Sequence, residues 1–145
     1  MKDFGKEEKI DNENIYNKYS RDELINQALN LHSQGRITEA SKYYQYCVQK
    51  GFNDYRVFSN YGIILRNQGK TKEAELAYRK AIDLNPDFAF AHSNLGNIQR
   101  NQGKTKEAEL SYRKAIEIDP NFVFAHSNLG NILRDQGKTK EAELA

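Results

Sequence analysis

Several features that would define a protein class are missing from this sequence of 145 residues. It has one cysteine, Cys47, so no disulfide can form within the chain and stability must come from packing. Apolar runs are short, such as residues 63–65, which argues against a membrane-spanning helix. Residues 1–11 are charged rather than apolar, unlike a secretory signal. A net charge of +2 does not predict a nucleic-acid partner. These absences favour a cytoplasmic protein.

Catalytic and metal-binding signatures are also missing. The glycines form no glycine-rich phosphate loop, and there is no paired cysteine or histidine cluster with zinc spacing. His92 and His126 are far apart in the sequence, and His32 has no ligand residue beside it. We therefore expect no enzyme activity, no bound metal and no cofactor.

What the sequence does contain is an internal repeat with a period of about 34 residues. Residues 69–76, GKTKEAEL, recur without change at 103–110 and at 137–144. Residues 92–98, HSNLGNI, return at 126–132, again one period later. A diverged copy precedes them, with Gly35 and Ala40 at the positions of Gly69 and Ala74. The repeat units are therefore about 21–54, 55–88, 89–122 and an incomplete 123–145.

Each unit is expected to form two helices. In the third unit a first helix over 91–101 is followed by Gly103, a residue suited to closing a helix. The second helix ends near Pro120, and its apolar residues lie at spacings i, i+4, i+7 and i+8, which form one stripe on a helix. Those residues are Ala108, Tyr112, Ala115 and Ile116. The fold predicted from the sequence is all-α.

These units resemble tetratricopeptide repeats over residues 21–145. The pattern of that family appears in the third unit as His92, Leu95, Gly96, Gln99, Ala108, Tyr112 and Pro120. Two positions depart from it: Gln99 is polar where the family has a large apolar residue, and the first unit lacks the final proline. The resemblance implies a right-handed α–α superhelix, or solenoid, of helical hairpins that binds proteins and carries out no chemistry. The AHSNLGN segment is most similar to the repeats of O-linked N-acetylglucosamine transferases and to related bacterial arrays.

One asparagine recurs on the first helix of every unit. At about 100° per residue, this position lies opposite the packing stripe, and the resemblance implies that this side lines a concave groove for peptides. The recurring residues are Asn26, Asn60, Asn94 and Asn128, with Asn97 and Asn131 one turn further along. A carboxamide both donates and accepts, so such a ladder is suited to gripping a peptide backbone. The alternative is that these side chains only cap or solvate the helices.

Two further rows are candidate contacts on the same side. Phe90 and Phe124 either offer apolar anchors to a ligand or pack against Phe88 and Phe122 at the unit junctions. A row of arginines lies at the edge of the expected groove, where it either grips acidic side chains or is simply solvated. It consists of Arg66, Arg100 and Arg134.

The two ends of the sequence differ from the repeats. Residues 1–20 are rich in charge and are expected to form a flexible tail. The fourth unit stops at Ala145, within its second helix, so no polar cap covers its apolar face. We expect this end to fray or to self-associate, exposing Leu133 and Leu144.

Two classes of function fit the sequence. One is a stand-alone adaptor that binds a protein or peptide partner through its groove. The other is the recognition arm of a larger enzyme, such as a glycosyltransferase or a sulfotransferase. The gene sequence that follows Ala145 would distinguish them.

Overall fold

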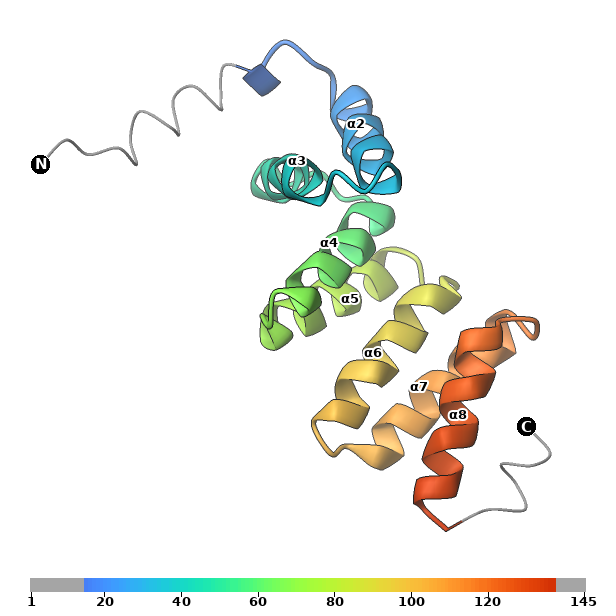
Figure 1. Ribbon diagram of the computed structural model, residues 1–145. Helices are drawn as coiled ribbons and strands as arrows, with labels where there is room; N and C mark the ends of the chain where they lie inside the picture. The colour runs from blue at the N-terminus through green and yellow to red at the C-terminus, as the bar shows by residue number, and fades with distance from the viewer. Residues whose placement is uncertain (1–14, 138–145) are drawn as a thin grey trace, which may run out of the picture. The chain divides into compact units, whose positions relative to one another are not determined.

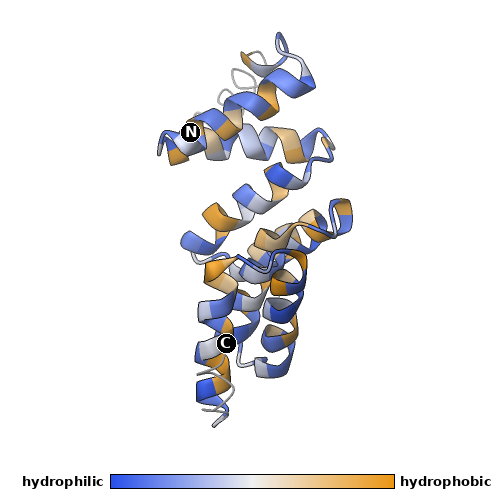
Figure 2. Cartoon of the chain, turned by 90° about the vertical axis from the view of Figure 1, so that its right-hand side faces the viewer, coloured by the Kyte–Doolittle hydropathy of each residue, from blue (hydrophilic) through white to orange (hydrophobic). Residues whose placement is uncertain are grey.

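The computed structural model describes residues 15–137, which fall into two compact units, Met1–Phe52 and Asn53–Ala145. The described residues form seven α-helices and no strand. None of these helices is long and apolar enough to cross a membrane. Figure 2 shows polar and apolar residues alternating along the helices, as expected for helices that each bury one side.

The first unit is a pair of packed helices, α2 (Arg21–Ser33) and α3 (Ile37–Gln49). Ser20 caps α2: its hydroxyl accepts a hydrogen bond from the backbone N–H of Glu23 at 3.2 Å. Tyr16 is buried, with its ring centroid 4.9 Å from that of Tyr43 and 4.6 Å from that of Tyr46, both on α3. Most of the tail predicted for residues 1–20 lies outside the described residues.

The second unit is a helical-repeat solenoid made of hairpins (Figure 1). The first hairpin joins α4 (Tyr55–Asn67) to α5 (Thr71–Leu84), and the second joins α6 (Ala89–Asn101) to α7 (Thr105–Ile118). α8 (Val123–Asp135) follows and packs on α7 and α6. α4 also contacts α6, so the first helices of successive repeats are direct neighbours. The predicted all-α arrangement of hairpins is confirmed.

A glycine closes the first helix of each hairpin, as the sequence predicted. Gly69 and Gly103 adopt φ values of +77° and +75°, in the left-handed region where a Cβ is costly. Beyond Gly103 the backbone N–H of Lys104 donates to the carbonyl of Gln99 at 2.8 Å. The chain thereby reverses direction within a few residues and places the second helix against the first.

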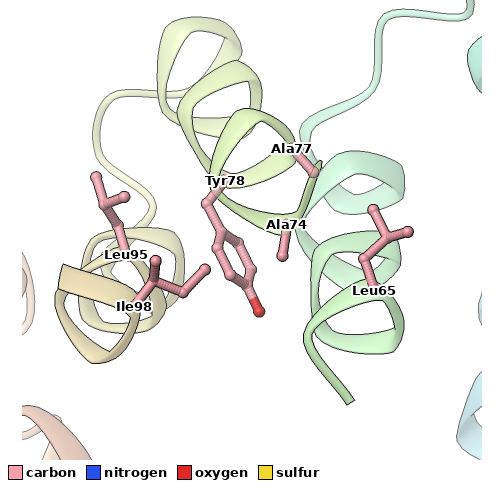
Figure 3. Packing of buried hydrophobic residues seen from close by; sticks show 6 residues of the cluster. All are labelled: Leu65, Ala74, Ala77, Tyr78, Leu95 and Ile98. Carbon is pink, nitrogen blue, oxygen red and sulfur yellow. The ribbon is translucent and has the colours of Figure 1, made fainter. Parts of the chain in front are cut away.

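The core of each hairpin is built around one tyrosine of its second helix. The Tyr78 ring of α5 lies between Leu65 of α4 and the α6 residues Leu95 and Ile98 (Figure 3). Tyr112 of α7 forms the equivalent centre with Leu129, Ile132 and Leu133 of α8. Both tyrosines are fully buried. Each aromatic ring therefore fills the space between its own hairpin and the following helix.

The expected exposure of Leu133 is wrong. Its side chain is fully buried because it packs with Ala108 and Tyr112 of the preceding α7. Leu144 and the proposed fraying or self-association of the carboxyl end fall on residues outside 15–137. The interpretation of Cys47 as a small apolar core residue agrees with its complete burial on α3.

Close contact between tyrosine and glycine predicts the effect of adding one methyl group. A Cβ at Gly96 would lie 2.7 Å from Cε1 of Tyr112, and one at Gly62 would lie equally close to Tyr78. The rigid ring would have to shift, at a typical overpacking cost of about 1–3 kcal/mol, partly offset by the roughly 1 kcal/mol better helix propensity of alanine. Gly96→Ala should therefore lower the urea midpoint of unfolding measured by circular dichroism. Ser127→Ala, on an exposed position of α8, is the control and should leave the midpoint nearly unchanged.

Candidate functional site

The first helices of the second unit bring three of the predicted asparagines onto one surface. Asn60 of α4, Asn94 of α6 and Asn128 of α8 occupy equivalent repeat positions on helices that contact one another. We call this surface, with the neighbouring predicted residues on the same helices, the asparagine face. Asn60 and Asn128 are half-buried, whereas Asn94 is only 9% exposed. The three carboxamides therefore differ in how much of them a ligand meets directly.

Asn26 belongs to the first unit and is described separately. It is exposed on α2 and lines a cavity of about 320 Å³. The other residues around this cavity are Tyr19, Glu23, Leu24, Gln27, Asn30 and Tyr43. Asn26 thus contributes to a polar hollow of its own unit.

Asn97 joins two repeats through one oxygen atom. Its Oδ1 accepts a hydrogen bond from the Tyr112 hydroxyl at 2.7 Å and another from Nδ2 of Asn128 at 3.1 Å. Tyr112 belongs to the same hairpin, while Asn128 belongs to the following helix α8. Asn131, the equivalent of Asn97 in α8, is half-buried. Asn97 therefore has a structural partner as well as its predicted place on the binding surface.

One repeat earlier, the same position holds an apolar residue. Ile63 is the equivalent of Asn97 in that repeat, and it packs against the cluster that contains Tyr78. The Tyr78 hydroxyl and Nδ2 of Asn94 are the equivalents of the two donors that Asn97 satisfies. Both are buried, and neither has a hydrogen-bond partner. Burial raises the pKa of Tyr78 to about 12, which keeps its hydroxyl protonated as a donor.

The arginine row is also uneven. Nη2 of Arg100 lies 3.5 Å from Oδ2 of Asp135 on the next first helix, so this guanidinium is paired within the chain. Asn101 takes the place of Asp135 one repeat earlier, and half-buried Arg66 makes no ion pair with any residue in 15–137. Arg134 is exposed at the end of α8. Of the three predicted arginines, Arg100 is thus the one with an acidic neighbour.

Aromatic rings form a continuous row beside the asparagines. Successive centroid distances along the row are 4.9 Å, 5.9 Å, 6.3 Å and 6.1 Å. In order, the rings belong to Tyr55, Phe88, Phe90, Phe122 and Phe124. Phe90 is half-buried between Phe88 and Phe122, whereas Phe124 is 70% exposed. Packing at the junction accounts for Phe90, while most of the Phe124 ring is left for a ligand.

Comparison with known families assigns the repeats. Models described as "Tetratricopeptide repeat" match residues 89–122 and 111–144, and one described as "TPR repeat" matches residues 62–103. Together the matches span more than half of the chain. The chain carries tetratricopeptide repeats. Such repeats are generally non-catalytic modules for protein–protein interaction.

Solved tetratricopeptide structures share the fold at low sequence identity. A crystal structure of MamA superposes with a TM-score of 0.76 at 23% identity, covering 85% of this chain and 72% of that one. The first tetratricopeptide domain of Spaghetti (RPAP3), solved with the HSP90 peptide SRMEEVD, has a TM-score of 0.71 at 22% identity. That alignment covers 81% of this chain and 93% of the other. The comparison with curated protein sequences returns no match.

Local hydrogen bonds explain two departures from the tetratricopeptide pattern. His92 replaces the usual aromatic residue, and its Nε2–H donates to the carbonyl of Pro86 at the unit junction, 2.8 Å away. Buried Gln99 replaces a large apolar residue, and its Oε1 accepts from the Ser111 hydroxyl at 2.6 Å. Neither contact has a distinctive sequence signal beyond the two unusual residues themselves. Within residues 15–137, no three histidine, cysteine, aspartate or glutamate side chains gather as a metal site would require.

The two buried hydroxyls predict opposite responses to the same substitution. Tyr112→Phe removes the hydrogen bond to Asn97 and should destabilise the fold by about 1 kcal/mol. Tyr78→Phe removes a hydroxyl that has no partner, so it should be neutral or stabilising. Urea unfolding of both variants and the parent measures the difference. Equal losses of stability in the two variants would contradict the hydrogen-bond assignment.

Burial of tyrosine also predicts a loss of stability at alkaline pH. The pKa of Tyr78 is raised to about 12 in the fold, whereas an unfolded tyrosine ionises near its ordinary value of 10.0. The unfolded state therefore loses its proton first, and stability that is complete below pH 10 is lost between about pH 10 and 12. A shift of this size corresponds to about 2–3 kcal/mol at the upper end.

Unfolding by urea at pH 9 and at pH 11.5 tests this for the parent and for Tyr78→Phe. The variant has no ionisable group at this position, so its stability should fall less between the two pH values. If parent and variant lose the same free energy of unfolding, Tyr78 is not the group responsible.

Proposed function

We propose that this chain is a non-catalytic interaction module that binds an extended peptide segment of a protein partner on the asparagine face. The observation that carries the proposal is the recurrence of a carboxamide on three adjacent first helices, beside a row of aromatic rings. Carboxamides bind backbone amides of any sequence, and exposed aromatic rings select apolar side chains. An extended peptide offers both kinds of group along its length.

The residues of this face have different roles in the proposal. Asn60 is half-buried on α4, and Asn128 lends one amide hydrogen to Asn97 while its Oδ1 remains available as an acceptor for the peptide. Phe124 is the aromatic anchor, since 70% of it is exposed. Asn131 and Arg134 extend the contact along α8.

Two kinds of support lie outside this chain. The RPAP3 domain, which shares the fold, was solved with a bound peptide. The arrays of O-linked N-acetylglucosamine transferases, which the AHSNLGN segments resemble, are known for an asparagine ladder. We propose a ligand of the same general class here, a protein segment rather than a nucleic acid or a membrane, and a cytoplasmic location.

Replacing the ladder asparagines tests the proposal. A peptide selected from a displayed random library against the full chain is labelled and titrated by fluorescence anisotropy. Asn60→Ala, Asn94→Ala and Asn128→Ala combined should weaken its binding roughly a hundredfold, since each hydrogen bond contributes about 0.5–1.5 kcal/mol. The fold should persist because alanine favours helix more than asparagine does, and circular dichroism checks this.

A matched control replaces apolar residues on the other helices. Leu76 of α5 and Leu110 of α7 are each 68% exposed, and the Leu76→Ala, Leu110→Ala variant should bind the peptide as the parent does. Loss of binding in this control, with full binding by the folded asparagine variant, would place the site on the second helices and overturn the proposal.

A further inference from the structure

Two successive layers of the second unit carry the same hydrogen-bond donors. The α6–α8 layer contains the Tyr112 hydroxyl, the Asn128 amide and the Arg100 guanidinium. The α4–α6 layer contains their equivalents from one repeat earlier, which are Tyr78, Asn94 and Arg66. Any difference between the layers must therefore come from the groups that accept.

Both acceptors of the α6–α8 layer are replaced in the α4–α6 layer. Asn97, whose Oδ1 takes hydrogen bonds from Tyr112 and Asn128, becomes Ile63, which has no polar side-chain atom. Asp135, whose carboxylate pairs with Arg100, becomes uncharged Asn101. The α4–α6 layer thus keeps its donors and its positive charge but loses the oxygen atoms that would receive them.

The physical consequence is visible at the two neutral donors. Tyr78 is 0% exposed and Asn94 is 9% exposed, yet the Tyr78 hydroxyl and the Asn94 Nδ2 have no hydrogen-bond partner. Leaving such groups unpaired costs free energy, and native proteins rarely do so. A ligand oxygen that accepted from both would recover that cost on binding.

We propose that the α4–α6 layer is a carboxylate-binding subsite, in which the Tyr78 hydroxyl and the Asn94 amide donate to a ligand carboxylate while the Arg66 guanidinium neutralises it. This inference rests on the proposed peptide-binding function and names the chemistry that one segment of the peptide must carry. A carboxylate fits because it only accepts and can take several donors at once. Charge-assisted hydrogen bonds in a partly buried place are stronger than neutral ones.

Access to this subsite passes two half-buried side chains, Ile63 and Arg66. The donor atoms themselves lie below the surface, so a rotamer change of these side chains accompanies binding. The carboxylate belongs either to the carboxyl terminus of the peptide or to an aspartate or glutamate side chain. The α6–α8 layer, whose donors are satisfied internally, does not take this group.

Three capped tripeptides distinguish the sources of the carboxylate. Acetyl-Ala-Ala-Ala with a free carboxyl terminus carries a terminal carboxylate, and acetyl-Ala-Glu-Ala-amide carries one on a side chain. Acetyl-Ala-Gln-Ala-amide is the neutral match of the second probe. Each is titrated into isotopically labelled full chain at constant ionic strength, and the side-chain amide signals of Asn94 and the Nε–H signal of Arg66 are followed by NMR.

We expect saturable shifts at Asn94 and Arg66 with at least one carboxylate probe and at least tenfold weaker binding of the glutamine probe. Binding of the first probe alone assigns the site to a carboxyl terminus, binding of the second alone to an acidic side chain, and binding of both to a carboxylate in either place. If the glutamine probe binds as well as the glutamate probe and the terminal-acid probe does not bind better, the proposal is wrong.

Variants in the two layers complete the test. Ile63→Asn supplies the missing acceptor from within the chain, so it should compete with the probes and weaken their binding at least tenfold. Tyr78→Phe and Arg66→Gln should each weaken binding several-fold, and they decide the question should Ile63→Asn fail to fold. Tyr112→Phe and Arg79→Gln are the matched controls, from the satisfied layer and from the exposed side of α5, and should bind as the parent does.

Unchanged binding in Ile63→Asn and Tyr78→Phe would overturn the carboxylate subsite. Peptide binding on the asparagine face is measured separately, with the library-selected peptide. If that peptide still depends on the ladder asparagines while the carboxylate probes fail, the subsite alone is refuted. If the selected peptide is also insensitive to those asparagines, the wider function fails with it.

Discussion

The contact between a tyrosine ring and a glycine is the constraint on which each hairpin of the second unit depends. Tyr78 lies on Gly62 and Tyr112 on Gly96, so closely that a single Cβ would clash with either ring. Because the first helix has no side chain there, the ring can fill the space up to the next first helix. The same placement carries each hydroxyl through the core toward the asparagine face. Packing and the polar chemistry of the site therefore have a common origin.

A buried hydroxyl must then be accommodated, and each repeat does so differently. Tyr44 of the first unit forms a hydrogen bond with Nδ1 of His32 at 3.0 Å, and burial lowers the pKa of that histidine. Tyr112 donates to Asn97, whereas Tyr78 has no partner. Burial raises the pKa of Tyr112 as it does that of Tyr78, with nearby Arg100 opposing the shift. Repeats that are nearly identical in sequence thus differ in the polar groups they leave unsatisfied.

The repeat period was enough to predict the helices, the turns at Gly69 and Gly103 and the burial of the tyrosines, because these depend on contacts within one hairpin. Contacts between hairpins could not be predicted in this way. The bond from Asn128 to Asn97 joins residues 31 positions apart, a spacing that matches no periodicity of a single helix. Leu133 was expected to be exposed because only its own incomplete hairpin was considered, although the preceding α7 also buries it. The side chains of the asparagine face are likewise placed by neighbouring repeats.

Comparison of the repeats separates compensated changes from uncompensated ones. Leu65 and Ala77, both buried in the first hairpin of the second unit, become Gln99 and Ser111 in the next, and the new polar pair satisfies itself at 2.6 Å. Both partners changed, so the core kept its hydrogen bonds without outside help. At Ile63 only the acceptor is absent, while the two donors remain buried beside it. A purely structural layer with Ile63 would be relieved by phenylalanine at position 78, since that removes one unpaired donor and keeps the ring. The retained hydroxyl is explained if its acceptor comes from a bound partner.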